Sequence, residues 1–144
     1  MEQNRYDEAE KAWLIATKMK PNFTVAWNNL IILNDNNGNH SNAVKLAEEA
    51  LEHLQDEPSI HFNMANALGK LGEFQKSESH FLKALKLNPN NAHYHVNLGV
   101  LYHRWKKYRK AEESYKKALK INPGLKSAKE NYGLLKKSLD KDRE

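Results

Sequence analysis

The sequence predicts an all-α fold, a right-handed α-solenoid of antiparallel helix pairs. The first observation behind this prediction is a set of four asparagines, Asn29, Asn63, Asn97 and Asn131, that recur every 34 residues. The second is that small, glycine and aromatic positions repeat with the same spacing. A period of about 34 residues is the length of one helix-turn-helix unit. We therefore expect about seven to eight helices stacked in a single domain, residues 1–144.

Placing these asparagines at the sixth position of each unit divides the chain into five segments. They are the second half of a truncated repeat (1–23), three full repeats (24–57, 58–91 and 92–125) and a C-terminal capping helix (126–144). Because residues 5–21 predict only the second helix of a unit, we expect the chain to come from a longer array. The charged stretch Lys136–Glu144 is typical of the polar cap that ends a solenoid.

Each recurring position has a physical role. Two columns of small residues let paired helices approach closely: Ala9, Ala43, Ser77 and Ala111, and Ala16, Ala50, Ala84 and Ala118. Gly38 and Gly72 predict turns with positive φ between the two helices of a repeat. Lys106 stands at the same place in the next repeat, at a cost of about 1–2 kcal/mol if its backbone is left-handed.

One contact between paired helices departs from the column pattern. The position that holds Ala65 and Gly99 in later repeats is Ile31 in the first full repeat. The aromatic position that faces it in other repeats is Ala47 there. We therefore expect a large residue and a small one to have exchanged sides of this contact.

These columns resemble the tetratricopeptide repeat, and the resemblance covers nearly the whole chain. A narrower resemblance lies in AWNNLIIL (26–33), ANALGK (65–70), FLKALKLNPN (81–90), NLGVLYHRW (97–105) and KENYGLL (129–135). These strings look like the C-terminal repeats of the transmembrane and tetratricopeptide-repeat-containing proteins. That resemblance implies an endoplasmic reticulum membrane protein that takes part in O-mannosylation of cadherin-type domains, with its repeats in the lumen. The catalytic residues would then lie outside this chain.

The first helices of the repeats line the concave side of such a solenoid, so we expect a peptide-binding groove there. Its predicted residues are Asn29, Ile32, Phe62, Asn63, Asn66, Lys70, Val96, Asn97, Val100, Arg104 and Asn131. A carboxamide offers both donors and an acceptor, so it matches the groups of a peptide bond. Four net hydrogen bonds contribute about 2–6 kcal/mol, against about 4–15 kcal/mol for association. The asparagines would set register while apolar side chains anchor the ligand. The alternative, that they satisfy neighbouring helices, stays open.

Composition limits the remaining chemistry. The chain has no cysteine, which excludes disulfides and thiolate metal sites. Two sequons, at Asn22 and Asn39, are candidate N-glycosylation sites in turns.

Residues 1–91 carry 9 basic and 12 acidic side chains, whereas residues 92–144 carry 14 basic and 6 acidic ones. The basic excess lies at Arg104, Lys106, Lys107, Arg109, Lys110, Lys116, Lys117 and Lys120. It is either a solvated face or a contact for an anionic partner or for lipid headgroups.

Several functions are disfavoured. His93 and His95 diverge on a helix and no HExxH spacing occurs, so we expect no metal site, and we expect no catalytic residue and no cofactor. The aromatic residues beside the basic excess fall on packing positions, which argues against nucleic acid. No stretch approaches the ~20 apolar residues of a membrane span, so we expect no membrane insertion.

The leading prediction is an interaction module that binds a protein or an extended peptide, including a cadherin-type substrate, in the endoplasmic reticulum lumen. The alternatives are a cytoplasmic scaffold, a co-chaperone-like adaptor, or a structural spacer.

Some tetratricopeptide modules bind the C-terminal carboxylate of a chaperone with cationic residues. The matching positions here read Asn28, Ile32, Asn63, His93 and Asn97. Three cationic positions are absent, which disfavours the adaptor.

Overall fold

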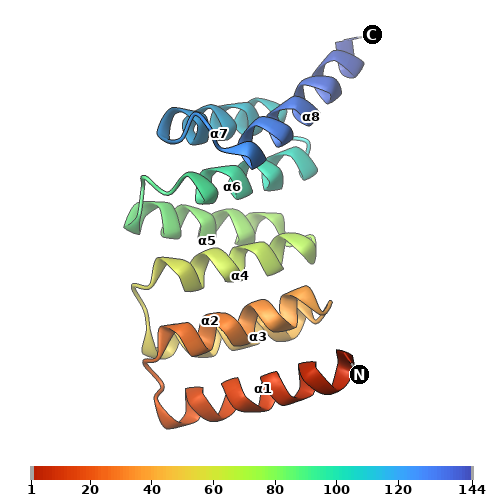
Figure 1. Cartoon of the computed structure of the whole chain (residues 1–144). Helices are drawn as coiled ribbons and strands as arrows, with labels where there is room; N and C mark the ends of the chain where they lie inside the picture. Colours follow the sequence, from red (N-terminus) through yellow and green to blue (C-terminus); the bar gives the residue numbers. More distant parts are fainter. Residues whose placement is uncertain (1, 144) are drawn as a thin grey trace. The chain divides into compact units, whose positions relative to one another are not determined.

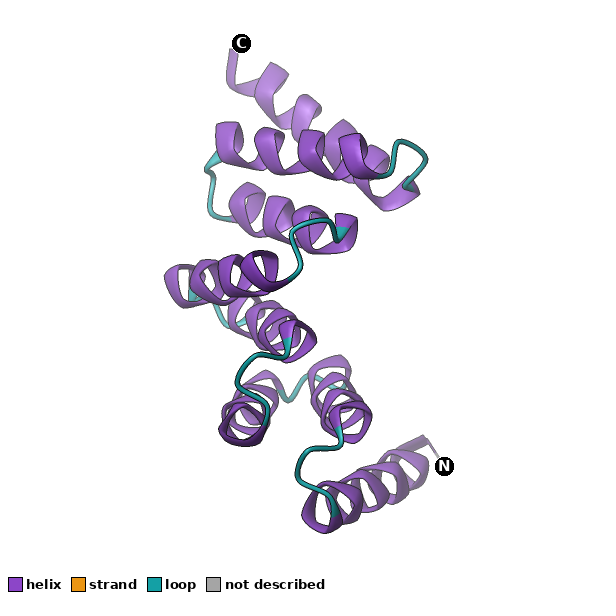
Figure 2. Ribbon diagram, turned by 90° about the vertical axis from the view of Figure 1, so that its left-hand side faces the viewer, coloured by secondary structure: helices purple, strands orange, loops and turns teal. Residues whose placement is uncertain are grey.

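The computed structural model describes residues 2–143, with side chains up to residue 141. Eight α-helices and no strand occur in this part of the chain (Figures 1 and 2). They are α1 (Glu2–Met19), α2 (Thr24–Asn36), α3 (His40–His53), α4 (Pro58–Lys70), α5 (Phe74–Leu87), α6 (Ala92–Arg104), α7 (Tyr108–Ile121) and α8 (Lys126–Arg143). The predicted all-α class is confirmed.

The helices form two compact units, residues 1–87 and 88–144. Unit 1 contains α1 to α5, and unit 2 contains α6 to α8. The predicted repeats each contain one helix pair, the half repeat contains α1, and the cap contains α8. The description as one domain and the right-handed sense of the solenoid stay predictions.

The core of unit 1 is built from α2, α3 and α4 with support from α1. Its buried apolar side chains are Trp27, Leu30, Ile31, Ala43, Val44, Leu46, Ala47, Ala50, Ile60, Met64, Ala67 and Leu68. Ile31 and Ala47 are both fully buried in this cluster. The large residue is thus on the first helix of the repeat and the small one on the second, as the exchange predicts.

In unit 2 the same contact has the opposite arrangement. Tyr115 on α7 is 1% exposed and lies against Gly99 on α6. A Cβ at Gly99 would lie 2.6 Å from Cε1 of the tyrosine ring, closer than real contacts allow. Burial raises the pKa of the Tyr115 hydroxyl to about 12. Gly99 is therefore required by packing, because the aromatic ring occupies the space of its missing side chain.

The turns within the three repeats share a left-handed residue. Gly38 has φ 86° and Gly72 has φ 80°. Lys106 takes the same role with φ 62°, and in residues 2–143 no other residue apart from glycine has positive φ. Lys106 is therefore left-handed, the case for which the sequence analysis expected a cost, and the turn keeps its geometry without glycine.

A ring N–H in the first turn of α2, α4 and α6 contacts a carbonyl in the turn that leads into that helix. Each pair is separated by six residues: Trp27 Nε1 with Pro21 (2.7 Å), His61 Nε2 with Gln55 (3.1 Å) and His95 Nε2 with Pro89 (3.0 Å). Since a carbonyl only accepts, each ring nitrogen carries the hydrogen. This repeated bond holds the turn between repeats, and it gives both histidines a structural role.

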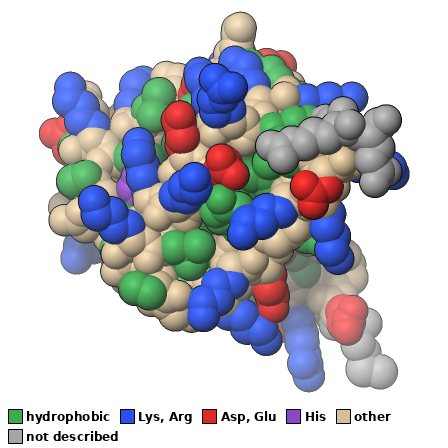
Figure 3. All heavy atoms as spheres, turned by 90° about the horizontal axis from the view of Figure 1, so that it is seen from above, with side chains coloured by type: hydrophobic (Ala, Val, Ile, Leu, Met, Phe, Trp, Pro, Cys, Tyr) green, Lys and Arg blue, Asp and Glu red, His purple; other side chains and the backbone are tan. Residues whose placement is uncertain are grey.

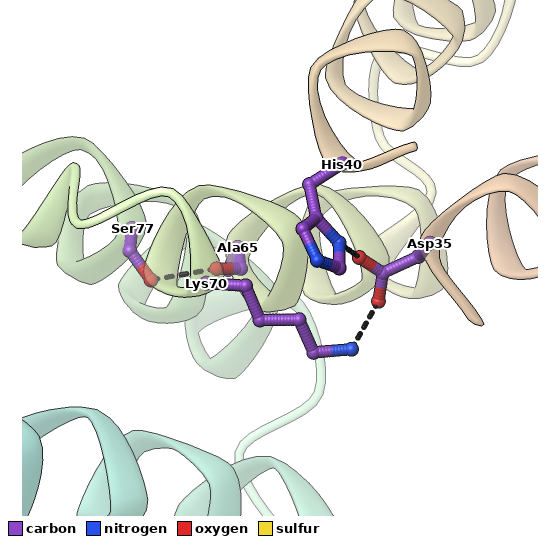
Figure 4. Close-up of polar contacts among 5 residues, drawn as sticks. All are labelled: Asp35, His40, Ala65, Lys70 and Ser77. Carbon is purple, nitrogen blue, oxygen red and sulfur yellow. Dashed lines mark hydrogen bonds and ion pairs between the residues drawn. The ribbon is translucent and has the colours of Figure 1, made fainter. Parts of the chain in front are cut away.

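The small-residue column also carries a hydrogen bond. Ser77 on α5 is fully buried, and its hydroxyl donates to the carbonyl of Ala65 on α4 at 2.7 Å (Figure 4). A buried hydroxyl without a partner would be costly. The bond therefore lets serine replace alanine where the two helices approach closely.

Candidate peptide-binding faces

In unit 1 the first helices of two successive repeats, α2 and α4, are joined by polar side chains. Asn63 Nδ2 donates to Asn28 Oδ1 at 2.7 Å, and Asn28 Nδ2 donates to Ser59 Oγ at 2.8 Å. Ser59 in turn donates to Glu57 Oε1 at 2.9 Å. Asn63, one of the four recurring asparagines predicted to line the groove, is therefore partly used to hold the neighbouring helix.

A second link joins the C-terminal ends of α2 and α4. The carboxylate of Asp35 accepts from Lys70 Nζ through Oδ2 and contacts His40 Nδ1 through Oδ1, both at 2.6 Å (Figure 4). Asp35 is only 8% exposed, so these partners offset the loss of its hydration. The predicted groove lysine thus lies on the expected helix, but its charge is held by an internal carboxylate.

Other predicted residues of this face remain accessible. Ile32 is 40% exposed, and Asn29 is half-buried and makes no hydrogen bond with the residues that the structure describes. Phe62 is half-buried, with its ring edge against Phe81 at 6.0 Å between centroids. Asn66 is half-buried on the same helix. Apolar surface and a carboxamide without a partner therefore occur together on α2.

Unit 2 presents its own face on α6 and α8. His103 Nε2 lies 3.1 Å from Ser138 Oγ and links these two helices. Val100 is half-buried and Arg104 is exposed, but Val96 is only 2% exposed and contributes to packing. We therefore leave Val96 out of the residues proposed below to contact a ligand. Asn97 on α6 is half-buried and already interacts with another residue.

The fourth asparagine, Asn131 on α8, is half-buried and forms no hydrogen bond within residues 2–143. The bond between Asn28 and Asn63 joins residues 35 apart, and the residue at that distance before Asn131 is Val96. A valine side chain offers no polar atom. Asn63 is thus bonded to a neighbouring helix, whereas Asn29 and Asn131 form no hydrogen bond within the described residues. A ligand-binding role of the four asparagines and their alignment on one wall stay predictions.

In unit 1 a pair of histidines connects α4 and α5. His61 and His80 stack with ring centroids 5.3 Å apart and face each other through their Nδ1 atoms at 3.0 Å. Because His61 Nε2 donates to a carbonyl, its Nδ1 accepts from His80 Nδ1–H when both rings are neutral. Burial, with help from Lys83 and His61, lowers the pKa of His80 to about 4. The ring of His80 therefore stays neutral at ordinary pH.

The two sequons differ in their surroundings. Asn22 is exposed in the turn between α1 and α2 and makes no side-chain hydrogen bond with the described residues. Asn39 donates through Nδ2 to the hydroxyl of Tyr6 at 3.2 Å. That hydroxyl donates to Asn34 Oδ1 at 3.0 Å. Since the Asn Nδ2 is the atom that receives a glycan, Asn22 is the more accessible site.

The buried polar group around Asn34 was not predicted from the sequence. Asn34 is 1% exposed, donates to the Leu30 carbonyl at 2.9 Å and accepts from Tyr6 and Asn42. Asp35 beside it was likewise missed as a link between repeats. Both are polar residues in the last turn of α2, directly after the apolar run Leu30–Leu33, and this position is the signal that the sequence offered.

Metal-binding clusters and membrane-spanning helices are both absent from residues 2–143. No group of three or more His, Asp, Glu or Cys side chains is placed to hold a metal ion. None of the described helices combines the length and hydropathy that crossing a bilayer requires.

Comparison with known proteins identifies the repeats. Two sequence families, both described as tetratricopeptide repeat, match residues 1–58 and 56–123. The chain is an array of tetratricopeptide repeats. Such arrays are protein-interaction modules.

Two curated relatives match part of the array. The protein O-mannosyl-transferase F38B6.6 of Caenorhabditis elegans is 33% identical over 64 residues, which is 44% of this chain and 9% of that protein. The protein O-mannosyl-transferase TMTC4 of Mus musculus is 45% identical over 58 residues, 40% of this chain and 8% of that protein. The repeats therefore resemble those of this transferase family, and the chain spans less than a tenth of either relative.

Solved structures agree on the fold. MamA superposes with a TM-score of 0.81 at 22% identity, over 96% of this chain and 81% of that one. The first repeat domain of human RPAP3 gives a TM-score of 0.79 at 18% identity, over 85% and 97%. The first repeat domain of Spaghetti (RPAP3), bound to the HSP90 peptide SRMEEVD, gives 0.73 at 18% identity, over 81% and 92%. At these identities the similarity shows the tetratricopeptide fold alone.

Proposed function

We propose that this array binds an extended protein segment along the first helices of its repeats, as the partner- or substrate-recruiting part of a protein O-mannosyltransferase of the endoplasmic reticulum lumen. The observation that carries the binding site is the face of α2 in unit 1. There Asn29 has no hydrogen-bond partner among the described residues, beside Ile32 at 40% exposure. A carboxamide with spare donors and acceptor beside exposed apolar surface suits a peptide backbone and its side chains.

Asn63 supports the same site in a second way. Its Nδ2 is bonded to Asn28, but its carbonyl oxygen makes no hydrogen bond within the described chain. The bond fixes the side chain, so a ligand N–H meets an acceptor that is already oriented. Preorganisation of this kind reduces the entropy lost on binding.

The proposed parent enzyme rests on the two O-mannosyl-transferase relatives and on the motifs that resemble the transmembrane and tetratricopeptide-repeat-containing family. Cadherin-type domains are the substrate class that this resemblance implies. The accessible sequon at Asn22 fits exposure to a luminal glycosylation machinery.

A photo-crosslinking experiment tests the binding face. A photoreactive phenylalanine analogue replaces Ile32 in one variant and Leu82 on α5, 50% exposed, in the matched control. We expect crosslinks to a purified cadherin-type domain from position 32 and only background from position 82. Equal yields at the two positions would contradict a binding face on α2.

A co-chaperone-like adaptor is the competing function. The Spaghetti domain holds an acidic HSP90 peptide. Here two of the equivalent clamp positions, Asn28 and Asn63, bond to each other and supply no cation. Binding of that peptide, measured by fluorescence anisotropy and lost in Asn29→Ala, would favour the adaptor. Crosslinks to the cadherin-type domain alone would favour the transferase parent.

A further inference from the structure

The turn between α6 and α7 concentrates positive charge in a way that the equivalent turns do not. Its cations, called here the basic turn, are Lys106, Lys107, Arg109 and Lys110. The equivalent segments in unit 1 are Gly38–Asn42, with His40 as its single titratable side chain, and Gly72–Lys76, with Glu73 and Lys76. The basic turn is therefore a property of one repeat and not of the repeat pattern.

Two features of the backbone make the residues at this place unfavourable for folding. Lys106 has φ 62°, a conformation that glycine adopts more readily and that glycine supplies in both other turns. Arg109 and Lys110 lie in the first turn of α7, where the helix dipole favours acidic side chains. Since a neutral turn would fold more readily, the cations are better explained by a partner than by folding.

Two of the four cations of the basic turn are not neutralised by an acidic side chain in the described part of the chain. Lys106 and Arg109 form no ion pair with any residue in the described chain, and Glu113, one turn beyond Arg109, is likewise unpaired. Glu112 is used elsewhere: it accepts from Tyr132 at 3.0 Å and pairs with Lys116 at 3.6 Å. Lysine and arginine side chains (blue) outnumber acidic ones (red) on the face in Figure 3.

The shape around these residues suits a short flexible segment. Lys107, Tyr108, Arg109 and Lys110 line an open hollow of about 340 Å³. Lys107 Nζ lies 3.7 Å from the centre of the Trp105 ring, which stacks on Tyr102 at 6.4 Å. Because the indole is stacked on one side and covered by a cation, it is a poor platform for nucleobases.

A bilayer surface fits less well. The large exposed apolar side chains of unit 2, among its described residues, are Ile121 and Leu134. Ile121 is at the opposite end of α7 from the basic turn. Peripheral membrane binding combines cations with several apolar groups on one face, whereas Leu134 on α8 is then the one large exposed apolar side chain of unit 2, among its described residues, that is left to accompany the cations.

We propose that the basic turn is a docking surface for an acidic protein segment, a run of Glu or Asp residues in a flexible chain. The carboxylates pair with Lys106 and Arg109, and the hollow holds the segment against Tyr108. This surface is on the turn and α7, whereas the proposed peptide-binding face is on the first helices, so each can exist without the other.

Anisotropy of a fluorescein-labelled peptide of eight alternating Glu and Ser residues tests the proposal on the 144-residue chain. We expect binding that Lys106→Gly and Arg109→Gln each weaken about two- to fivefold, as for a surface ion pair. The control Lys117→Gln removes one exposed charge from the middle of α7 and should change affinity by less than about twofold. A peptide with Gln in place of Glu should not bind.

The Lys106→Gly variant separates binding from folding. Because glycine relieves the positive-φ strain, its melting temperature should rise by about 2–8 °C while affinity falls. Arg109→Gln provides a second measurement of the affinity in a variant whose left-handed turn residue is unchanged. Unchanged affinity in both variants, or an equal loss in Lys117→Gln, would overturn the proposal. So would preferential binding to phosphatidylserine vesicles or to a single-stranded RNA with the same sensitivity to these substitutions.

Discussion

The first full repeat, in unit 1, and the third, in unit 2, solve the same packing problem from opposite sides. In the first repeat α2 carries a buried Ile31 and α3 a buried Ala47, whereas the third repeat pairs Gly99 on α6 with Tyr115 on α7. Both pairs are buried, although their residue types differ. What the repeat preserves is the combined volume of the pair, because close packing responds to filled space and not to residue identity.

The units also differ in how they handle charge. Unit 1 carries 9 basic and 12 acidic side chains and holds its buried Asp35 between Lys70 and His40. Unit 2 carries 14 basic and 6 acidic side chains and leaves two cations of its turn without ion pairs among the described residues. The comparison teaches that unit 1 uses the Asp35–Lys70 ion pair to join two helices, whereas unit 2 leaves Lys106 and Arg109 without an ion pair in the described chain.

The largest expected effect tests the volume argument in unit 1. Ile31→Ala removes buried methyl groups opposite a residue that is already small, so nothing nearby can fill the cavity. We expect a loss of about 2–5 kcal/mol in the free energy of unfolding, measured by urea denaturation. An Ile31→Gly variant more stable than the parent would show that Ile31 and Ala47 do not share one contact.

The next effect tests the same contact in unit 2. Gly99→Ala places a Cβ 2.6 Å from the Tyr115 ring and should destabilise the chain by about 1–3 kcal/mol. Gly133 on α8 is the matched control, because a Cβ there meets no atom within 4 Å. Gly133→Ala should stabilise by about 0.5–1 kcal/mol through helix propensity. Equal effects of the two alanines in urea denaturation would refute the packing role of Gly99.

A smaller effect separates the roles of the asparagines in unit 1. Asn63→Ala removes the 2.7 Å bond to Asn28 and should cost about 0.5–1.5 kcal/mol in thermal denaturation. Asn29→Ala removes no bond within the described chain, so stability should stay within about 0.5 kcal/mol. Under the proposed function, Asn29→Ala weakens partner binding. Loss of stability in Asn29→Ala alone would reverse the two assignments.

The smallest effect concerns pH in unit 1. His80 has a pKa of about 4 in the folded chain and an ordinary value of 6.5 when unfolded. Between these values the unfolded chain binds more protons, so stability falls as pH falls from about 6.5 towards 4. We expect a loss of about 1 kcal/mol between pH 7 and pH 5, a figure reduced because the ring is partly exposed. His80→Gln, compared by urea denaturation at both pH values, should reduce this dependence, and an unchanged slope would contradict it.

Much of the fold could be predicted from spacing. The period of the asparagines led to the helix pairs, and the glycine column led to the left-handed turns, including the one at Lys106. Predictions of this kind succeed because a repeat imposes the same backbone geometry on every copy, so one column is read several times.

The candidate site was predicted less completely. The bonds from Asn63 to Asn28 and from Lys70 to Asp35 both span 35 residues, one more than the period. A column compares residues one period apart, so it does not show which neighbours meet across two helices. Val96 illustrates the difference, since its column suggested a groove position and its side chain is buried.

The sequence by itself determined the repeat length, the helical class, the turn positions and the imbalance of charge, because each depends on local geometry or on composition. The tertiary structure alone decided which asparagine is bonded and which is available. It also placed Asp35 between Lys70 and His40, and the Tyr115 ring in the space left by Gly99. These outcomes depend on side chains that meet across separate helices, and hydrogen bonds and packing act only over a few ångströms.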